Sequence, residues 1–140
     1  MAELYDLERT KALAASLAEK AKMGDCFCLT GDLGAGKTEF ARSFIQSLCG
    51  NVKVTSPTFT IVQEYDGQKP ATSRIAHYDL YRLKDAKELE ELGFEESLQN
   101  SISLIEWPQI AQDYLPKNRV EISLEIVDEA TRKITICQLP

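Results

Sequence analysis

One short segment, residues 31–38 (GDLGAGKT), combines glycines, a lysine and a hydroxyl at the spacing G-x-x-x-x-G-K-[ST]. In this pattern successive backbone N–H groups surround the β-phosphate of a nucleotide, and the positive end of the following helix points at it. Gly34 and Gly36 permit the turns and the close approach of the backbone. Lys37 would bridge the β- and γ-phosphates, and the Thr38 hydroxyl would be a ligand of Mg²⁺. The segment therefore predicts a nucleotide site.

Two acidic residues stand where apolar runs end, and either could complete such a site. Phosphoryl transfer needs an acid that helps to hold Mg²⁺ and a group that positions the attacking oxygen. Asp79 closes RIAHYD, and Glu106 closes SLIE. A single acid at a strand end is equally compatible with a solvated turn or a helix cap. Given the phosphate loop, we expect at least one of the two to face the metal.

Three further residues near these acids invite a functional interpretation. The segment TSPTFT, residues 55–60, lies where switch loops of P-loop proteins sense the γ-phosphate, although a plain Ser/Pro turn would look the same. We choose Thr58 as the sensing hydroxyl. Trp107 follows Glu106 and could lie at the rim of the site or pack in the core. His77 alternates with Asp79, so both could share a face, and we expect a structural hydrogen bond from it rather than catalysis.

The chain lacks the Asn-Lys-x-Asp segment by which Ras-type GTPases read guanine, and KNRV at residues 117–120 lacks the acid. We therefore favour ATP as the nucleotide. A small-molecule P-loop kinase would need a second substrate pocket and usually an arginine-bearing lid, and the six arginines are scattered singly. That kinase, and a nucleotide-gated binding module without turnover, remain the alternatives to an ATPase.

Hydrophobic periodicity predicts the elements that position these residues. Apolar positions at helical spacing, buried runs and turn residues predict the following elements: helices at 7–22 and 37–50, a strand at 25–30, a hairpin of 59–65 with 74–78, two short acidic helices within 85–98 that are separated at Gly93, a strand at 101–107, and a hairpin within 119–139. The phosphate loop thus lies between a strand and a helix. We predict one three-layer α/β domain of P-loop NTPase type over residues 1–140, whose mixed sheet has a parallel centre and antiparallel edge hairpins.

Composition limits the classes of partner and compartment. The 16 basic and 22 acidic residues give a formal charge of −6, which offers no overall attraction to nucleic acid. The chain has no apolar run long enough for a membrane span, and residues 1–20 lack the apolar centre of a signal peptide. We expect a cytoplasmic protein.

Four cysteines, Cys26, Cys28, Cys49 and Cys137, lack the paired C-x-x-C spacing of a zinc site, and the chain has a single histidine. We expect reduced, buried thiols. Cys26 and Cys28 would point to the same face of their strand, because side chains alternate along a strand.

Five segments, GDLGAGKT, SPTFTIVQEY, HYDLYRL, ELEELGFEE and LIEWP, occur in this order at spacings that resemble the TsaE family, the bacterial ATPases of tRNA threonylcarbamoyladenosine biosynthesis. The resemblance covers about residues 5–140. It implies an ATPase that binds a heterodimer of the catalytic transferase subunit and its non-catalytic paralogue. That complex modifies an adenosine in tRNAs that read codons beginning with A. ATP binding and hydrolysis would drive or reset its cycle, with tRNA contacted only indirectly and no membrane involved.

The resemblance also implies roles for individual residues. ATP would be held by the loop residues Leu33, Gly34, Ala35, Gly36, Lys37 and Thr38. Thr38 and Glu106 would bind Mg²⁺, and Asp79 would act in hydrolysis beside Lys37 and Thr58. Trp107 would lie near the nucleotide, and further nucleotide contacts would come from Leu7, Thr10 and Arg132. One departure stands out, because many members read GKTT where this chain has Glu39 after Thr38. If the Glu39 carboxylate turns toward the nucleotide, we expect weaker affinity.

Overall fold

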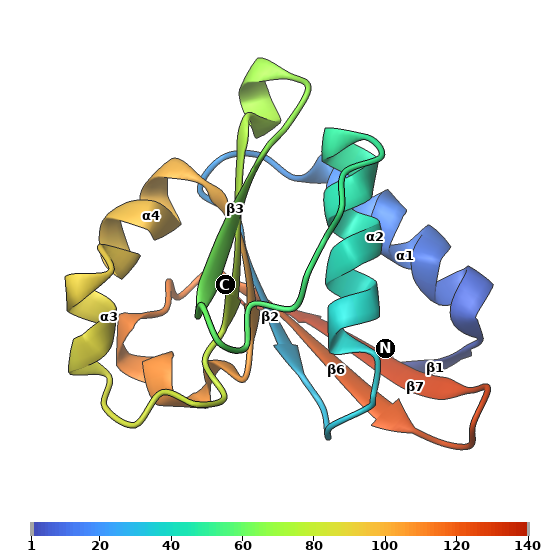
Figure 1. Ribbon diagram of the computed structural model, residues 1–140. Helices are drawn as coiled ribbons and strands as arrows, with labels where there is room; N and C mark the ends of the chain where they lie inside the picture. Colours follow the sequence, from blue (N-terminus) through green and yellow to red (C-terminus); the bar gives the residue numbers. More distant parts are fainter. Residues whose placement is uncertain (1, 140) are drawn as a thin grey trace.

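The computed structural model describes residues 2–139, which form one seven-stranded mixed sheet in the order β1-β7-β6-β2-β5-β4-β3 (Figure 1). The strands are β1 (Ala2–Tyr5), β2 (Cys26–Thr30), β3 (Val62–Asp66), β4 (Arg74–Asp79), β5 (Ile102–Glu106), β6 (Val120–Ile126) and β7 (Arg132–Gln138). The central strands β6, β2, β5 and β4 are parallel, whereas β3 pairs antiparallel with β4, and β7 pairs antiparallel with β6 and β1. The predicted sheet, with its parallel centre and antiparallel edges, is confirmed.

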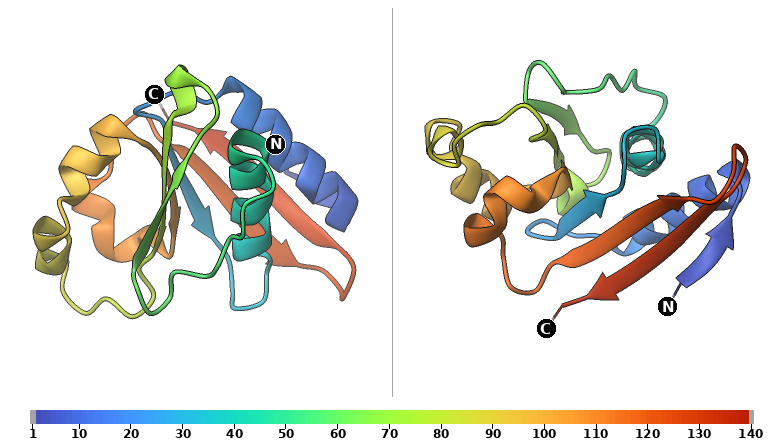
Figure 2. Two further views of the ribbon diagram at one scale, coloured as in Figure 1. Left: turned by 45° about the horizontal axis from the view of Figure 1, so that its top comes forward. Right: turned by 90° about the horizontal axis from the view of Figure 1, so that it is seen from below.

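Helices cover both faces of this sheet and make the three layers (Figures 1 and 2). They are α1 (Leu7–Lys20), α2 (Lys37–Cys49), α3 (Lys87–Glu91) and α4 (Phe94–Asn100), with short 3₁₀ helices η1 (Pro70–Thr72) and η2 (Pro108–Tyr114). Helices α1 and α2 pack in one apolar cluster with one face of the sheet, and α3, α4 and η2 pack in a second cluster on the other. Gly93, in the left-handed conformation, separates α3 from α4 as predicted.

The side chains of β2 point alternately into the two apolar clusters. Phe27 and Leu29 belong to the cluster under α1 and α2, whereas Cys26 and Cys28 belong to the opposite cluster, so the two thiols share a face as predicted. All four cysteines are free, and Cys26, Cys28 and Cys49 are buried. The expectation of burial is wrong for Cys137, which is exposed. The reason is that side chains alternate along β7, so Cys137 points to the opposite face from Ile134, whose side chain is buried in the core.

The N-terminal strand β1 is absent from the sequence-based prediction. It has only four residues, Ala2–Tyr5, and it pairs with β7 alone at the edge of the sheet. Such a short edge strand carries too little alternation to be recognised. Helix α1 begins at Leu7 because the Asp6 side chain caps it, accepting a hydrogen bond from the backbone N–H of Arg9 at 2.8 Å. The chain therefore enters the sheet before it forms the first predicted helix.

Gly31, at the start of the phosphate loop, is a position where we expect a large effect of one methyl group. A Cβ there would lie 2.4 Å from the Leu124 carbonyl oxygen and 3.1 Å from the Ala35 Cβ, whereas a Cβ at Gly34 would meet no atom within 4 Å. Both glycines have positive φ. We expect Gly31→Ala to lower the free energy of unfolding by about 1–3 kcal/mol more than Gly34→Ala, measured by urea denaturation. Equal losses in the two variants would contradict this prediction, because they would show that β6 moves away from the new methyl group at no cost in unfolding free energy.

Candidate nucleotide-binding site

The phosphate loop joins the carboxyl end of β2 to the amino end of α2. Gly36 occupies the N-cap of α2 in the left-handed conformation, and no side chain caps the helix. The first backbone N–H groups of a helix have no partner within it, and the helix dipole adds partial positive charge at this end. The loop therefore presents uncapped donors to an anion.

Lys37, the first residue of α2, is buried at this end of the helix. Its Nζ donates hydrogen bonds to the carbonyl oxygens of Gly31 at 2.6 Å and Asp32 at 3.0 Å, and lies 4.3 Å from the centroid of the Trp107 ring. Desolvation by burial lowers the pKa of Lys37, against the attraction of nearby carboxylates such as that of Glu106. Phosphate oxygens would offer this ammonium charged acceptors, which bind it more strongly than the carbonyls do.

The two strand-end acids lie side by side. The parallel register of β4 and β5 pairs Asp79 with Glu106, and both side chains are buried at the edge of the sheet where β2 also ends. Carboxyl ends of adjacent parallel strands meet at one edge, which is where open α/β sheets bind ligands. The sequence alone leaves the two acids as separate candidates, and the structure brings both of them to the phosphate loop.

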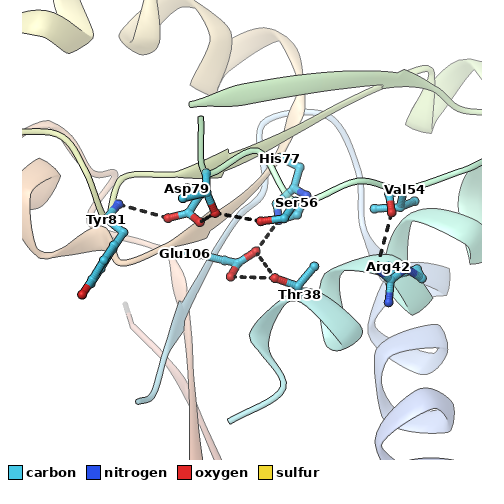
Figure 3. A network of polar contacts seen from close by, with 9 residues as sticks. Thr38, Arg42, Val54, Ser56, His77, Asp79, Tyr81 and Glu106 are labelled. Carbon is cyan, nitrogen blue, oxygen red and sulfur yellow. Dashed lines mark hydrogen bonds and ion pairs between the residues drawn. The ribbon is translucent and has the colours of Figure 1, made fainter. Parts of the chain in front are cut away.

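Glu106 connects the sheet to the phosphate-loop helix (Figure 3). The Thr38 hydroxyl lies 3.2 Å from each Glu106 carboxylate oxygen, and the His77 Nε2 lies 2.6 Å from Oε2. A hydroxyl and one carboxylate suit Mg²⁺, which takes oxygen ligands and usually keeps one or two carboxylates together with substrate phosphates. Among residues 2–139 no cluster of three or more His, Cys, Asp or Glu could hold a metal by itself. The donors present therefore fit a magnesium ion that is shared with a phosphate.

Asp79 is oriented by hydrogen bonds at both of its oxygens. The Thr58 hydroxyl donates to Oδ2 at 2.6 Å, and the backbone N–H of Tyr81 donates to Oδ1 at 3.0 Å. The Ser56 hydroxyl lies 2.8 Å from that of Thr58. Ile61, which directly follows the segment 55–60, is also tied to the end of β4, because its carbonyl accepts a hydrogen bond from the Asp79 N–H at 2.8 Å. The predicted polar loop therefore meets the second strand-end acid.

These groups line one cavity of about 360 Å³. Its lining residues are Leu33, Gly34, Gly36, Lys37, Thr38, Glu39, Ser56, Thr58, Asp79, Glu106 and Trp107. Nine of the residues that the sequence singled out for ATP, Mg²⁺ or hydrolysis thus surround a single space. Ala35, the remaining loop residue of that set, is fully buried and lines a neighbouring cavity instead.

Trp107 lies at this cavity in an unusual backbone conformation. Its φ is 55°, in the left-handed region that bulky residues rarely adopt, and its ring packs against Tyr81 with centroids 4.8 Å apart. Such conformations persist where the surrounding structure fixes them, and they concentrate at functional sites. The turn after Glu106 aims the indole over the Lys37 ammonium rather than into the apolar core, so the rim position was the better of the two expectations.

A second cavity, of about 580 Å³, lies on the other side of the phosphate loop. Leu7, Thr10 and Arg132 all line it, together with Gly34, Ala35 and Gly36. The Arg132 guanidinium donates to the carbonyl of Ala35 at 3.0 Å and to that of Gly34 at 3.3 Å, so it braces the outer side of the loop. The three residues predicted as additional contacts therefore gather in one cavity, whose lining does not include Asp79 or Glu106.

Glu39 lies where the two cavities meet and lines both of them. Its carboxylate forms an ion pair with Arg42 one helical turn later, and the side chain is 49% exposed. Arg42 also donates to the Val54 carbonyl at 3.4 Å (Figure 3). The ion pair draws the Glu39 charge along the helix surface, so the structure shows a partner for the charge that the sequence left unexplained.

Three contacts escaped the sequence-based interpretation. The partner of His77 was not predicted, nor were the roles of Ser56 and Tyr81 around Asp79. The available signal was alternation, which places His77 and Asp79 on one face, and the position of Tyr81 just after the strand-end acid.

No helix within the described residues 2–139 combines the length and apolar character that crossing a bilayer requires.

Comparisons with known proteins identify the family of this chain. The model of the family described as threonylcarbamoyl adenosine biosynthesis protein TsaE matches residues 4–134. A Rickettsia felis protein named tRNA threonylcarbamoyladenosine biosynthesis protein TsaE is 46% identical over 134 residues, which cover 95% of this chain and 77% of the relative. A Bacillus subtilis protein of the same name is 42% identical over 130 residues, 91% of this chain and 78% of the relative. The crystal structure of Bacillus subtilis YdiB matches with a TM-score of 0.77 and 31% identity, over 100% of this chain and 86% of that one. The chain therefore belongs to the TsaE family.

Proposed function

We propose that this protein is a Mg²⁺-dependent ATPase that supports threonylcarbamoyl modification of adenosine in tRNA. The observation that carries the proposal is the convergence of Lys37, Thr38, Asp79 and Glu106 on one cavity at the uncapped end of α2. A cation, a hydroxyl and two carboxylates around a helix N-terminus are the groups that phosphoryl transfer to water requires. Membership of the TsaE family supplies the biological process, through the names of the matching proteins.

One of the two cavities would hold the phosphates of the nucleotide, and the other would hold its nucleoside. Gly34 and Gly36 line both, so a triphosphate on the loop would have its γ-phosphate beside Lys37 and its nucleoside toward Arg132. The volume of about 580 Å³ on the nucleoside side is within the range of small-molecule pockets. Besides the guanidinium, the lining of that pocket includes apolar Leu7 and Leu124 and the hydroxyl of Thr10, whose proton is donated to the Asp6 carbonyl at 2.7 Å. Four acidic residues also line it: Asp6, Glu8, Glu39 and Glu129. We propose that it receives the ribose and adenine.

Thr38 and Glu106 would hold magnesium, which supplies charge neutralisation at the phosphate oxygens. Glu106 is almost fully buried, so water screens its charge little and its attraction for a cation is strong. Lys37, which lines the same cavity, adds a second positive charge.

Asp79 would position the attacking water and accept its proton. Its two oxygens are oriented by Thr58 and by the Tyr81 N–H, which leaves their remaining lone pairs for a water in the cavity. Because Thr58 belongs to the loop of residues 55–60, movement of that loop would change the orientation of Asp79. We therefore assign Thr58 to the coupling of loop position with hydrolysis.

We propose that the ATPase acts by binding a heterodimer of the catalytic transferase subunit and its non-catalytic paralogue in the cytoplasm, with tRNA reached only through that complex. The formal charge of −6 supports this division, because an acidic subunit gains nothing from the phosphate backbone of tRNA. The threonylcarbamoyl transfer itself would belong to the partner, and residues 1–140 would act as one ATPase domain.

The experiment that tests the proposal measures phosphate release from ATP and Mg²⁺ by this chain alone, by the heterodimer alone, and by both together. We expect slow release by the chain, and a rate for the mixture that differs from the sum of the separate rates. A rate equal to that sum would contradict the partner role. Transfer of phosphate to an added metabolite in place of water would identify the kinase alternative.

A further inference from the structure

We propose that His77 is a positioning residue for the metal-binding carboxylate of Glu106, an inference that rests on the proposed Mg²⁺·ATP site. His77 lies on β4 and Glu106 ends the neighbouring strand β5, and the His77 Nε2 is 2.6 Å from the Glu106 Oε2. A carboxylate oxygen accepts, so the Nε2 carries the hydrogen of this bond. The imidazole thereby fixes one of the two carboxylate oxygens.

Thr38 cannot fix the carboxylate by itself. Its hydroxyl lies 3.2 Å from both Oε1 and Oε2, which is long for a hydroxyl donor and does not distinguish between the two oxygens. The bond from His77 is shorter and engages Oε2 alone. The bond from His77 therefore sets the rotation of the carboxylate and leaves Oε1 beside the Thr38 hydroxyl. The Glu106 Oε1 and the Thr38 hydroxyl oxygen can then be ligands of one cation.

The surroundings of the imidazole argue against packing as its main role. His77 is fully buried, and its Nδ1 has no hydrogen-bond partner among the residues that the structure describes. A buried nitrogen without a partner costs free energy that an apolar side chain would not. The one bond that offsets this cost is the bond to Glu106. The histidine is thus explained by what it does to the carboxylate.

The test compares two amide substitutions that place their donors differently. Glutamine can bring its NH₂ near the position of the imidazole Nε2, whereas the shorter asparagine reaches only as far as Nδ1. The readout is Mn²⁺ binding to the protein in the presence of a non-hydrolysable ATP analogue, followed by the electron paramagnetic resonance of free Mn²⁺. Metal-free binding of the analogue, followed by Trp107 fluorescence in EDTA, reports whether the nucleotide site survives.

We expect His77→Asn to weaken Mn²⁺ binding about 10–100-fold, as loss of an outer partner of a metal ligand typically does, and His77→Gln to retain most of the affinity. Metal-free binding should stay unchanged in both. Ser103→Ala is the matched control, because Ser103 is buried on β5 with an unpartnered hydroxyl but belongs to the opposite face from Glu106. It should bind Mn²⁺ normally.

Wild-type Mn²⁺ affinity in a folded His77→Asn protein would overturn the inference. Equal losses in the asparagine and glutamine variants, accompanied by loss of metal-free binding, would overturn it too, because they would indicate a structural role. Failure of the wild-type protein to bind Mn²⁺ with the analogue would instead contradict the proposed function.

Discussion

Glu106→Gln should reduce Mg²⁺-dependent ATP turnover about 10²–10³-fold, which is the scale on which loss of one preorganised electrostatic group affects an enzyme. The substitution keeps the shape of the side chain and removes its charge. Glu106 is almost fully buried between His77 and the Thr38 hydroxyl, so no solvent charge compensates for the loss. Phosphate release at saturating ATP and Mg²⁺ is the measurement.

Glu125→Gln provides the matched control for this prediction. Glu125 lies on β6 with a side chain that is 68% exposed, and its partner Lys133 lies at 3.9 Å. Surface pairs of this kind contribute little, so the control should turn over ATP at the wild-type rate. Normal turnover by a folded Glu106→Gln protein would remove Glu106 from the metal site.

Asp79→Asn should lower turnover about 10²–10⁴-fold, the contribution typical of a positioned general base, while ATP affinity stays near that of the wild type. An amide can still accept the hydrogen bond from the Tyr81 N–H, but it cannot take a proton from water. Affinity can be followed by Trp107 fluorescence, because the ring lies at the cavity and the chain has one tryptophan.

The control for Asp79→Asn is Asp113→Asn, an exposed position within η2 that has no part in the cavity. A drop in affinity as large as the drop in turnover would show that Asp79 holds the nucleotide rather than the water. Retained tRNA modification by an Asp79→Asn protein that binds but does not cleave ATP would favour the nucleotide-gated module over the ATPase.

The phosphate loop could be predicted from sequence because its chemistry is local. Glycines at positive φ, a lysine and a hydroxyl act within eight consecutive residues, and the flanking strand and helix are long enough to show their periods. The alternating pattern likewise gave the terminal hairpin of β6 and β7. Elements of this kind need no information from the rest of the chain.

The pairing of distant residues could not be predicted, because it depends on strand register. Asp79 and Glu106 are neighbours only because β4 and β5 are parallel with those two residues opposite one another. The bond between His77 and Glu106 follows from the same register. Sequence reasoning could place each residue at a strand end, but a shift of one residue would have turned either side chain to the other face.

The short edge strand and the second cavity show the same limit. The four residues Ala2–Tyr5 form β1 because β7 offers an unpaired edge, which no local pattern announces. The family resemblance alone implied that Leu7, Thr10 and Arg132 contact the nucleotide, and no pattern in the sequence placed them near one another. Only the fold brings these three residues to one cavity. The entry to α1 and the turn before β7 both lie against the outer side of the phosphate loop.

The most direct measurement of the central claim is a single-turnover phosphate-release assay with excess purified protein over ATP, with Mg²⁺ and then with EDTA, for the wild type and Lys37→Ala. Lys37 is the group through which the loop would contact both terminal phosphates, and its ammonium is buried in the cavity. We predict release by the wild type that requires Mg²⁺ and is lost in the variant. Release that continues in EDTA, or at the wild-type rate in Lys37→Ala, would contradict the assignment of this cavity as a Mg²⁺·ATP site.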